Sequence, residues 1–385
     1  MQGIAMVGAQ DLIARAEALA GVFALTAAQR DALGGTPWHE RQLLRESGLL
    51  LLTVPEVYGG LGQSWPTFFE MVRVIARADS SLAHLFAYHH LQVITPHLLG
   101  TPEQCAHYYA QTVQQGWFWG NALNPLDRRM TATRTDAGWQ LNGLKNFCSG
   151  ATGSEVLVVS ALRPDTGALL VGVIPTEREG ITILNDWNNM GQRQTDSGSI
   201  AFSGVLLRDE EILGPPGPLG STFASLRSCF AQLILANIFL GTAQGALATA
   251  RTYTLNSAMK PSAPTVLHRY GTMWVDLQAA QLVTDQAARH LQTAWDRGDE
   301  LTPQERGEHA LTIASAKVLT SKVALDITAQ VFEVMGARAT DSKFRFDRYW
   351  RNVRTLTLHD SVDAKVHELG DWALNHELPT PSFYS

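Results

Sequence analysis

The stretch Leu141-Asn-Gly-Leu-Lys-Asn-Phe-Cys-Ser-Gly150 lies in the part of the chain where short strand patterns replace helical ones. Glycine, asparagine and aspartate separate the apolar runs of this region, as turns require. The runs that predict strands are Met130–Arg134, Trp139–Leu141, Val156–Ala161, Leu169–Pro175, Ile181–Leu184 and Ser199–Leu207. Their number and spacing predict a compact β-barrel or sandwich of roughly a hundred residues.

Helical patterns flank this region on both sides. Apolar residues recur at three- and four-residue spacing in Phe69–Ile75 and Leu82–Val93, and again in Tyr270–His290 and His309–Val331. The proline- and glycine-rich stretch 214–220 marks the boundary before the second helical block. The order of patterns predicts an α+β protein with three segregated domains, at residues 1–115 (helical), 116–220 (β) and 221–385 (helical bundle).

Composition limits the classes of protein to which this chain could belong. The 385 residues are 45% hydrophobic, enough for well-filled cores, and only 17% charged, which indicates surface hidden inside a large protein or between subunits. The net charge is −6 and no cluster of Lys and Arg occurs, which argues against nucleic-acid binding. No apolar run reaches the roughly 18 residues of a membrane span. The start, Met1–Gly21, lacks signal-peptide features, so we expect a cytoplasmic protein that begins with a helix.

General catalytic and metal motifs are missing from the sequence. Cys105, Cys148 and Cys229 are widely spaced and no C-x-x-C occurs, which predicts free buried thiols and no metal site. No G-x-G-x-x-G follows a strand pattern, so a nicotinamide Rossmann site is not supported. Neither G-x-S-x-G nor H-E-x-x-H is present.

Three segments carry a resemblance to a known family. Val54-Pro-Glu-Val-Tyr-Gly-Gly-Leu-Gly62, the opening stretch Leu141–Gly150, and Gln330-Val-Phe-Glu-Val-Met-Gly-Ala-Arg338 resemble, in order, signatures of the acyl-CoA dehydrogenase superfamily. The resemblance implies an N-terminal helical domain, a central β-barrel or sandwich and a C-terminal four-helix bundle. It also implies a homotetramer in which C-terminal helices pair across subunits and help to complete a flavin site.

Departures from the family pattern indicate a subgroup. Leu358-His359-Asp360-Ser361 stands where acyl-CoA dehydrogenases usually carry a catalytic Glu in a Tyr-Glu-Gly-Thr context. This segment, together with Asn185-Asp-Trp187 and the polar run Gly191–Ser199, resembles flavin-dependent monooxygenases of the same fold, above all dibenzothiophene monooxygenase. The resemblance implies a two-component enzyme that takes reduced FMN from a separate flavin reductase, with FAD as the alternative cofactor. Such an enzyme forms a C4a-hydroperoxyflavin with O₂ and oxygenates a small aromatic or organosulfur substrate.

The chemistry of a flavin peroxide suggests catalytic residues. The peroxide must be shielded from water and held until transfer, and we expect Ser149 to bond near flavin N5. His359 is expected to manage protons because an imidazole titrates near neutral pH. Asp360 could orient that imidazole or act as a base itself.

Further residues are expected to bind the flavin and the substrate. Phe147 and Trp187 are expected beside the flavin ring, and cationic and hydroxyl donors are needed for its phosphate. The candidates for these phosphate donors are Ser197, Ser199, Arg269 and Arg338. The expected substrate pocket is apolar with a few polar groups. Its candidate lining residues are Tyr88, His89, Trp117 and Asn121.

Two other functions compete with oxygen transfer. An acyl-CoA dehydrogenase or oxidase would hold FAD tightly and use Asp360 as its base. A non-enzymatic scaffold would keep the fold without flavin affinity, although the retained flavin-facing segments argue against it.

Overall fold

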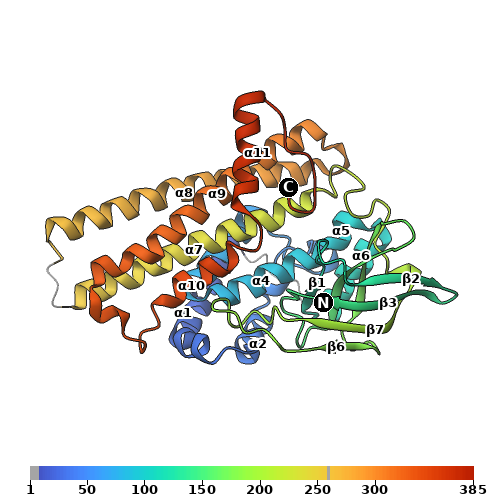
Figure 1. Cartoon of the computed structure of the whole chain (residues 1–385), viewed down its shortest axis with the longest axis horizontal. Coiled ribbons are helices and arrows are strands. Elements are labelled where there is room, and N and C mark those ends of the chain that lie inside the picture. Colours follow the sequence, from blue (N-terminus) through green and yellow to red (C-terminus); the bar gives the residue numbers. More distant parts are fainter. Residues whose placement is uncertain (1–7, 258–260) are drawn as a thin grey trace.

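The structure is a computed structural model, and it describes residues 8–257 and 261–385. Helices form its two ends in sequence, and a sheet lies between them (Figure 1). The predicted helical start falls partly outside the described residues, and α1 begins at Ala9.

In the described residues, six α-helices precede the sheet. They are α1 (Ala9–Leu33), α2 (Trp38–Glu46), α3 (Trp65–Ala78), α4 (Ser80–Val93), α5 (Thr95–Leu99) and α6 (Pro102–Gln115). The start of α4 is fixed by Asp79, whose Oδ1 accepts hydrogen bonds from the backbone N–H groups of Ser81 (2.9 Å) and Leu82 (3.1 Å). Every residue of α4 is buried, because this helix packs against both α7 and β1. In Figure 1 it lies between the helical bundle and the sheet.

The central domain is a mixed sheet of seven strands. They are β1 (Trp119–Ala122), β2 (Thr131–Thr135), β3 (Gly138–Lys145), β4 (Val156–Leu162), β5 (Leu169–Pro175), β6 (Ile181–Ile183) and β7 (Ile200–Leu207). The strand order is β1-β4-β2-β3-β7-β6, and β5 pairs with β4 along its whole length. The side chains of Leu141, Val159, Ile174 and Phe202 share one hydrophobic cluster, which holds the strands together. The strand β1 was not predicted.

The described part of the C-terminal block contains three long α-helices and two shorter ones. They are α7 (Leu226–Asn256), α8 (Pro264–Arg297), α9 (Pro303–Met335), α10 (Asp347–Leu356) and α11 (Val362–Asn375). The small residues of α7 permit close packing, since a Cβ atom at Gly245 would lie 2.1 Å from the Arg77 carbonyl oxygen of α3. By length and composition α7 could cross a membrane, but 78% of its apolar window is buried against the rest of the protein. Burial in the core therefore accounts for its apolar character.

Candidate functional site

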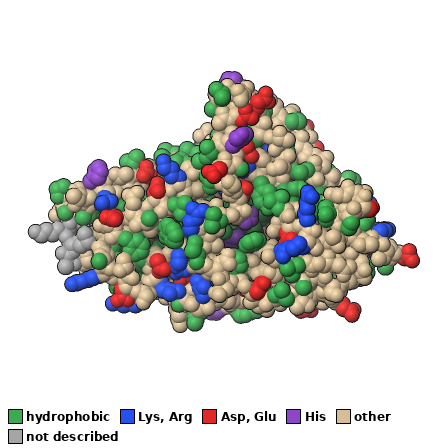
Figure 2. All heavy atoms as spheres, viewed as in Figure 1, with side chains coloured by type: hydrophobic (Ala, Val, Ile, Leu, Met, Phe, Trp, Pro, Cys, Tyr) green, Lys and Arg blue, Asp and Glu red, His purple; other side chains and the backbone are tan. Residues whose placement is uncertain are grey.

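A cavity of about 660 Å³ lies where the helical blocks meet the β-domain. Its β-domain wall, as we call it, consists of Phe147, Ser149, Trp187, Thr195 and Ser197. Its helical wall comes from α4 and α7 and consists of His84, Tyr88, Gln92, Arg227 and Gln232. Histidine side chains are visible near the middle of the face shown in Figure 2, between the bundle and the β-domain. The volume is in the range of cofactor and substrate sites.

One face of α4 supplies the helical wall because its residues recur at helical spacing. His84, Tyr88 and Gln92 are four residues apart, so their side chains lie above one another on the same face. The rings of His84 and Tyr88 are stacked, with centroids 4.1 Å apart. Sequence reasoning missed His84, although its spacing from Tyr88 was an available signal.

The histidine predicted to bind substrate lies elsewhere. His89 is fully buried outside the cavity, where its Nε2 lies 2.8 Å from the Leu50 carbonyl oxygen and its Nδ1 accepts a hydrogen bond from Trp119 N–H (3.1 Å). Both ring nitrogens bond to backbone, so His89 holds α4 against the η1 turn (Leu49–Leu51) and β1. The position of His89 in the prediction is therefore corrected, and His84 takes the place on the cavity wall.

Ser149 lies at the centre of a chain of hydroxyl hydrogen bonds. Its Oγ is 3.0 Å from His84 Nε2 and 2.7 Å from Ser197 Oγ, and Ser197 Oγ is 2.7 Å from Thr195 Oγ1. Thr195 donates its only hydroxyl proton to the Gln192 carbonyl oxygen (2.9 Å). Ser197 must then donate to Thr195, and Ser149 to Ser197, so His84 carries its proton on Nε2. One lone pair of Ser149 Oγ stays free for a donor in the cavity.

The two imidazoles that face the cavity are held neutral. Burial lowers the pKa of His84 to about 3, and the nearby His359 adds to this effect. His359 lies in the turn between α10 and α11, with its Nε2 3.5 Å from Tyr88 Oη. Enclosure by the protein lowers the pKa of His359 to about 4, and the charge of Lys317 lowers it while Asp360 opposes the shift. Both rings can therefore accept a proton only transiently near pH 7.

Asp360 is engaged beside the cavity. Its Oδ2 accepts hydrogen bonds from Lys317 Nζ (2.7 Å) and Gln232 Nε2 (2.8 Å), and it does not line the cavity. The side chain of Lys317 is 1% exposed and that of Asp360 is 10% exposed, so the two charges form a buried pair. This geometry suits a carboxylate that fixes the turn carrying His359 and does not suit a free base.

Two aromatic side chains on the β-domain wall, Phe147 and Trp187, are incompletely buried. Phe147 is 53% exposed and adopts a φ of +60°, and its ring centroid lies 6.2 Å from that of Trp187. The Trp187 indole donates its N–H to the Gln192 carbonyl oxygen (2.7 Å). A strained backbone that presents an aromatic ring to a cavity is typical of ligand sites. A flat ring system placed here would cover both side chains.

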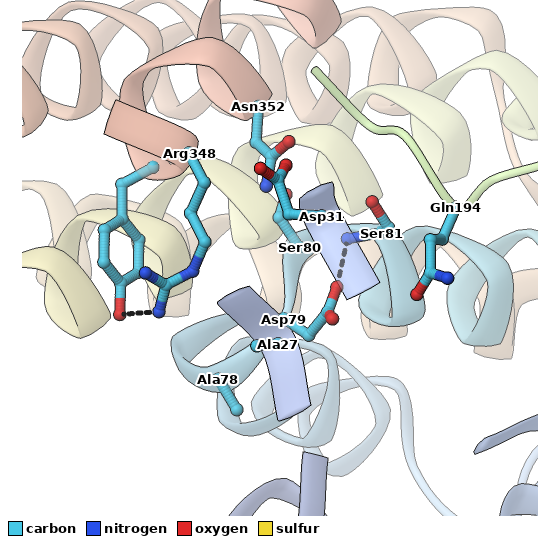
Figure 3. A pocket seen from close by; sticks show the side chains of 10 residues that line it. Ala27, Asp31, Ala78, Asp79, Ser80, Ser81, Gln194, Arg348 and Asn352 are labelled. Atoms are coloured by element: carbon cyan, nitrogen blue, oxygen red, sulfur yellow. Dashed lines mark hydrogen bonds between the residues drawn. The ribbon is translucent and has the colours of Figure 1, made fainter. Parts of the chain in front are cut away.

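The polar run 191–199 is anchored by residues far away in sequence. Gln192 donates its backbone N–H to Asn352 Oδ1 (2.7 Å) on α10 and its Nε2 to Ser80 Oγ (2.6 Å) on α4. Gly191 is required because a Cβ atom there would lie 2.1 Å from the Arg351 carbonyl oxygen. Behind the run is a second, polar space of about 10 Å³, shown in Figure 3 with Asp79 and Asn352 at its edge. It has room for about a single water molecule.

The remaining predicted residues divide between the cavity and other places. Asn121 lines the cavity and donates from Nδ2 to the Phe147 carbonyl oxygen (3.3 Å). Ser199 instead donates to Asp186 Oδ2 (2.7 Å), which closes the end of the polar run. Trp117 lines a different cavity, of about 540 Å³, beside α6 and β5. Neither of these two side chains lines the main cavity, which corrects their predicted positions.

The two arginines among the predicted phosphate donors lie away from the cavity within this subunit. Arg269 is near the start of α8, and its guanidinium lies 3.4 Å from a Glu333 carboxylate oxygen on α9. Arg338 is exposed in the 3₁₀ turn that follows α9. Neither arginine lines the cavity of its own chain. In Figure 1, α8 begins at the end of the bundle that is away from the sheet.

Comparison with known families agrees with this architecture. Models of the N-terminal, middle and C-terminal domains of acyl-CoA dehydrogenase match residues 14–115, 123–205 and 233–364. The chain belongs to the acyl-CoA dehydrogenase family. The predicted fold class and family are thereby confirmed.

Several proteins that are similar to this chain over nearly their whole length are monooxygenases. The chain is 51% identical to the probable FMNH₂-dependent monooxygenase SfnC of Pseudomonas putida, over 97% of both chains. Methanesulfinate monooxygenase MsuC from Pseudomonas fluorescens is 49% identical, with a TM-score of 0.95 over 97% of this chain and 99% of that one. FMN-bound TdsC from Paenibacillus sp. A11-2, a dibenzothiophene monooxygenase, is 41% identical, with a TM-score of 0.91 over 97% of this chain and 100% of that one. The resemblance to the monooxygenase subgroup is also confirmed.

Proposed function

We propose that this protein is an FMNH₂-dependent monooxygenase that oxygenates a small organosulfur compound. Reduced FMN diffuses in from a separate flavin reductase, and O₂ adds to it as a C4a-hydroperoxyflavin. The balance is one substrate, one FMNH₂ and one O₂ consumed, with the oxygenated substrate, FMN and water formed. The similarity to SfnC, MsuC and TdsC supports the reaction class.

The free lone pair of Ser149 carries the proposal. Reduced flavin bears a proton on N5 and oxidised flavin does not, so a group that accepts a hydrogen bond beside N5 favours the reduced form. The chain from Ser149 through Ser197 and Thr195 to the Gln192 carbonyl commits the Ser149 proton and leaves its oxygen as that acceptor. Phe147 and Trp187 would cover the flavin ring.

His359 and Tyr88 would manage protons at the substrate side of the flavin. A neutral His359 can take a proton during the reaction, and burial raises the pKa of Tyr88 so that its hydroxyl stays a donor. Tyr88 is buried but His359 is exposed, so the bound flavin and substrate would themselves complete the shield that keeps bulk water from the reacting peroxide.

The competing acyl-CoA dehydrogenase function would require Asp360 as a free base. Its carboxylate is bonded to Lys317 and Gln232, which argues against that role.

Assembly is part of the proposal. In a homotetramer, α8 and the turn after α9 of one subunit would meet the cavity of another, and Arg269 and Arg338 would then serve the flavin phosphate of that neighbour. Light scattering tests this assembly, and a monomer that binds FMN as tightly as its relatives would contradict it.

Rapid mixing tests the reaction. The protein with FMNH₂ is mixed with aerated buffer, and the flavin spectrum is followed with time. We expect a transient C4a-hydroperoxyflavin before oxidised FMN appears. Direct oxidation to FMN at the rate of free FMNH₂ would contradict the proposal, and bleaching of bound FAD by an acyl-CoA would favour the competing function.

A further inference from the structure

Arg227 is a cation on the helical wall without a carboxylate partner. It lies in the first turn of α7, and its Nε donates to Thr95 Oγ1 (2.9 Å) while its Nη2 donates to Gln92 Oε1 (3.0 Å). No ion pair joins it to any carboxylate in residues 8–257 and 261–385. Burial lowers the pKa of Arg227 to about 10, so the guanidinium still carries its charge at pH 7. An enclosed cation normally has an anionic partner, because the loss of hydration is costly otherwise.

Gln92 adds a second donor without a partner. Its side chain is fully buried, its Oε1 accepts from Arg227, and its Nε2 has no hydrogen-bond partner within the described protein. The oxygen and the N–H₂ group of a side-chain amide lie in one plane and point away from each other. The hydrogen bond from Arg227 to the oxygen therefore fixes where the N–H₂ group lies. Buried donors are rarely left unbonded, which indicates that a ligand supplies the acceptor.

The surroundings of the two donors are suited to a small anion with an alkyl group. The start of a helix carries a partial positive charge, which disfavours a cation such as Arg227 and favours an anion beside it. Leu91, Ala231 and Leu235 line the same part of the cavity with apolar side chains. Tyr88 and Tyr384 place hydroxyl groups nearby but contribute no negative charge at neutral pH, because burial raises the pKa of both.

This group of donors is separate from the β-domain wall. Gln92 is eight residues after His84, which corresponds to about 12 Å along the axis of α4. His84 contacts Ser149, whereas Gln92 contacts Arg227. The flavin ring and an anionic head group can therefore occupy the cavity at the same time.

We propose that Arg227 and the Nε2 of Gln92 bind the anionic head of the substrate, which makes the substrate an organosulfur oxyanion such as an alkanesulfinate. This inference rests on the proposed monooxygenase function. The guanidinium fork and the amide would hold the two sulfinate oxygens, and the lone pair of sulfur would stay free to take the transferred oxygen. The reaction R–SO₂⁻ + FMNH₂ + O₂ → R–SO₃⁻ + FMN + H₂O balances, with two electrons from sulfur and two from the flavin.

A comparison of two substrates of nearly equal shape tests the assignment. Methanesulfinate carries the charge, and dimethyl sulfoxide replaces one of its oxygens by a methyl group. We expect Arg227→Gln to lower kcat/KM for methanesulfinate about 100-fold, mainly through KM, since a charged partner is removed from an enclosed site. Activity toward dimethyl sulfoxide and the Kd of FMN should change no more than about threefold, because neither depends on the charge. Arg227→Lys should restore part of the sulfinate activity.

The control is Arg163→Gln, which removes an equal charge from a partly exposed arginine paired with Asp165. Thermal unfolding and the FMNH₂ transient confirm that each variant is folded and reacts with O₂. An Arg227→Gln protein that keeps its sulfinate activity, or that loses FMN affinity to the same extent, would overturn the assignment. A wild-type protein that forms the transient but oxygenates no sulfinate would overturn it as well, and would leave the monooxygenase function standing. Without the transient, the monooxygenase function itself fails.

Discussion

The two walls of the cavity differ in how completely their polar groups are bonded within the protein. On the β-domain wall, the hydroxyls of Ser149, Ser197 and Thr195 form an ordered chain that ends on a backbone carbonyl. On the helical wall, Arg227 lacks a carboxylate and Gln92 Nε2 lacks any partner in the described residues. Side chains that are already hydrogen-bonded to one another suit a cofactor, which is the same in every catalytic cycle. Donors without a partner in the protein suit a substrate, which enters and leaves. The contrast supports the proposal that flavin binds at the β-domain wall and substrate at the helical wall.

The largest effect is expected at His359, which lines the cavity next to Tyr88 of the helical wall. We expect His359→Ala to lower the yield of oxygenated product about 1000-fold, because a general acid or base contributes on the order of 10²–10⁴-fold. FMNH₂ should still be consumed, with hydrogen peroxide formed in place of product. The exposed His367→Ala variant is the control. Equal product yields from both variants would show that His359 has no part in oxygen transfer.

The ion pair behind His359 gives the next effect. Asp360→Asn leaves the buried ammonium of Lys317 without its carboxylate, and we expect the free energy of unfolding to fall by about 3 kcal/mol. Chemical denaturation measures this value, with the exposed Asp363→Asn as the matched change. A loss below about 1 kcal/mol, typical of a surface pair, would show that the pair is not buried in solution.

A smaller effect is expected on the β-domain wall. Ser149→Ala removes the acceptor proposed for reduced N5, and we expect the lifetime of the flavin transient to fall about 10–100-fold, as for loss of a hydrogen bond of about 1.5–3 kcal/mol. Ser160→Ala is a close control, because Ser160 is also fully buried in the β-domain and its Oγ has no hydrogen-bond partner among the residues that the structure describes. Similar lifetimes in the two variants would remove Ser149 from the flavin site.

The smallest effect concerns acid stability. Burial lowers the pKa of His84 and His89 to about 3 and that of His359 to about 4. The unfolded chain takes up protons below pH 6.5 and the folded protein does not, so stability is lost as the pH falls from about 6.5 toward 4. The buried His84 and His89 each contribute a slope of about 1.4 kcal/mol per pH unit in that window, and His359, whose side chain is exposed to solvent, contributes less. In urea unfolding, His89→Asn should reduce the slope of the free energy of unfolding against pH by the contribution of one histidine. Identical slopes in the two proteins would mean that His89 is accessible to protons in the folded state.

The sequence patterns predicted the blocks of the fold more fully than the site. Long periodic runs such as Leu82–Val93 and alternating runs such as Val156–Ala161 report their own local structure, and both became elements close to the expected bounds. Trp119–Ala122 escaped prediction because four residues are too few to display a period, and this strand forms through parallel pairing with β4.

Site residues depend on rotation and on distant partners, which a linear pattern does not contain. The motif resemblance led to Ser149, Phe147, Trp187 and His359, all of which line the cavity. The choice of His89 over His84 failed because the direction of each face of α4 is set by contacts with Leu50 and Trp119. The sequence did not indicate a binding role for Arg227, because its position is fixed by hydrogen bonds to Thr95 and Gln92, more than 130 residues away.

Isotope transfer tests the central claim most directly. The protein, FMNH₂ and methanesulfinate are mixed with isotopically labelled O₂, and the sulfonate is examined by mass spectrometry. The account predicts one labelled oxygen atom in each sulfonate formed, with product in proportion to the FMNH₂ supplied. Sulfonate without label, or oxidation of FMNH₂ with hydrogen peroxide as the sole product, would contradict it.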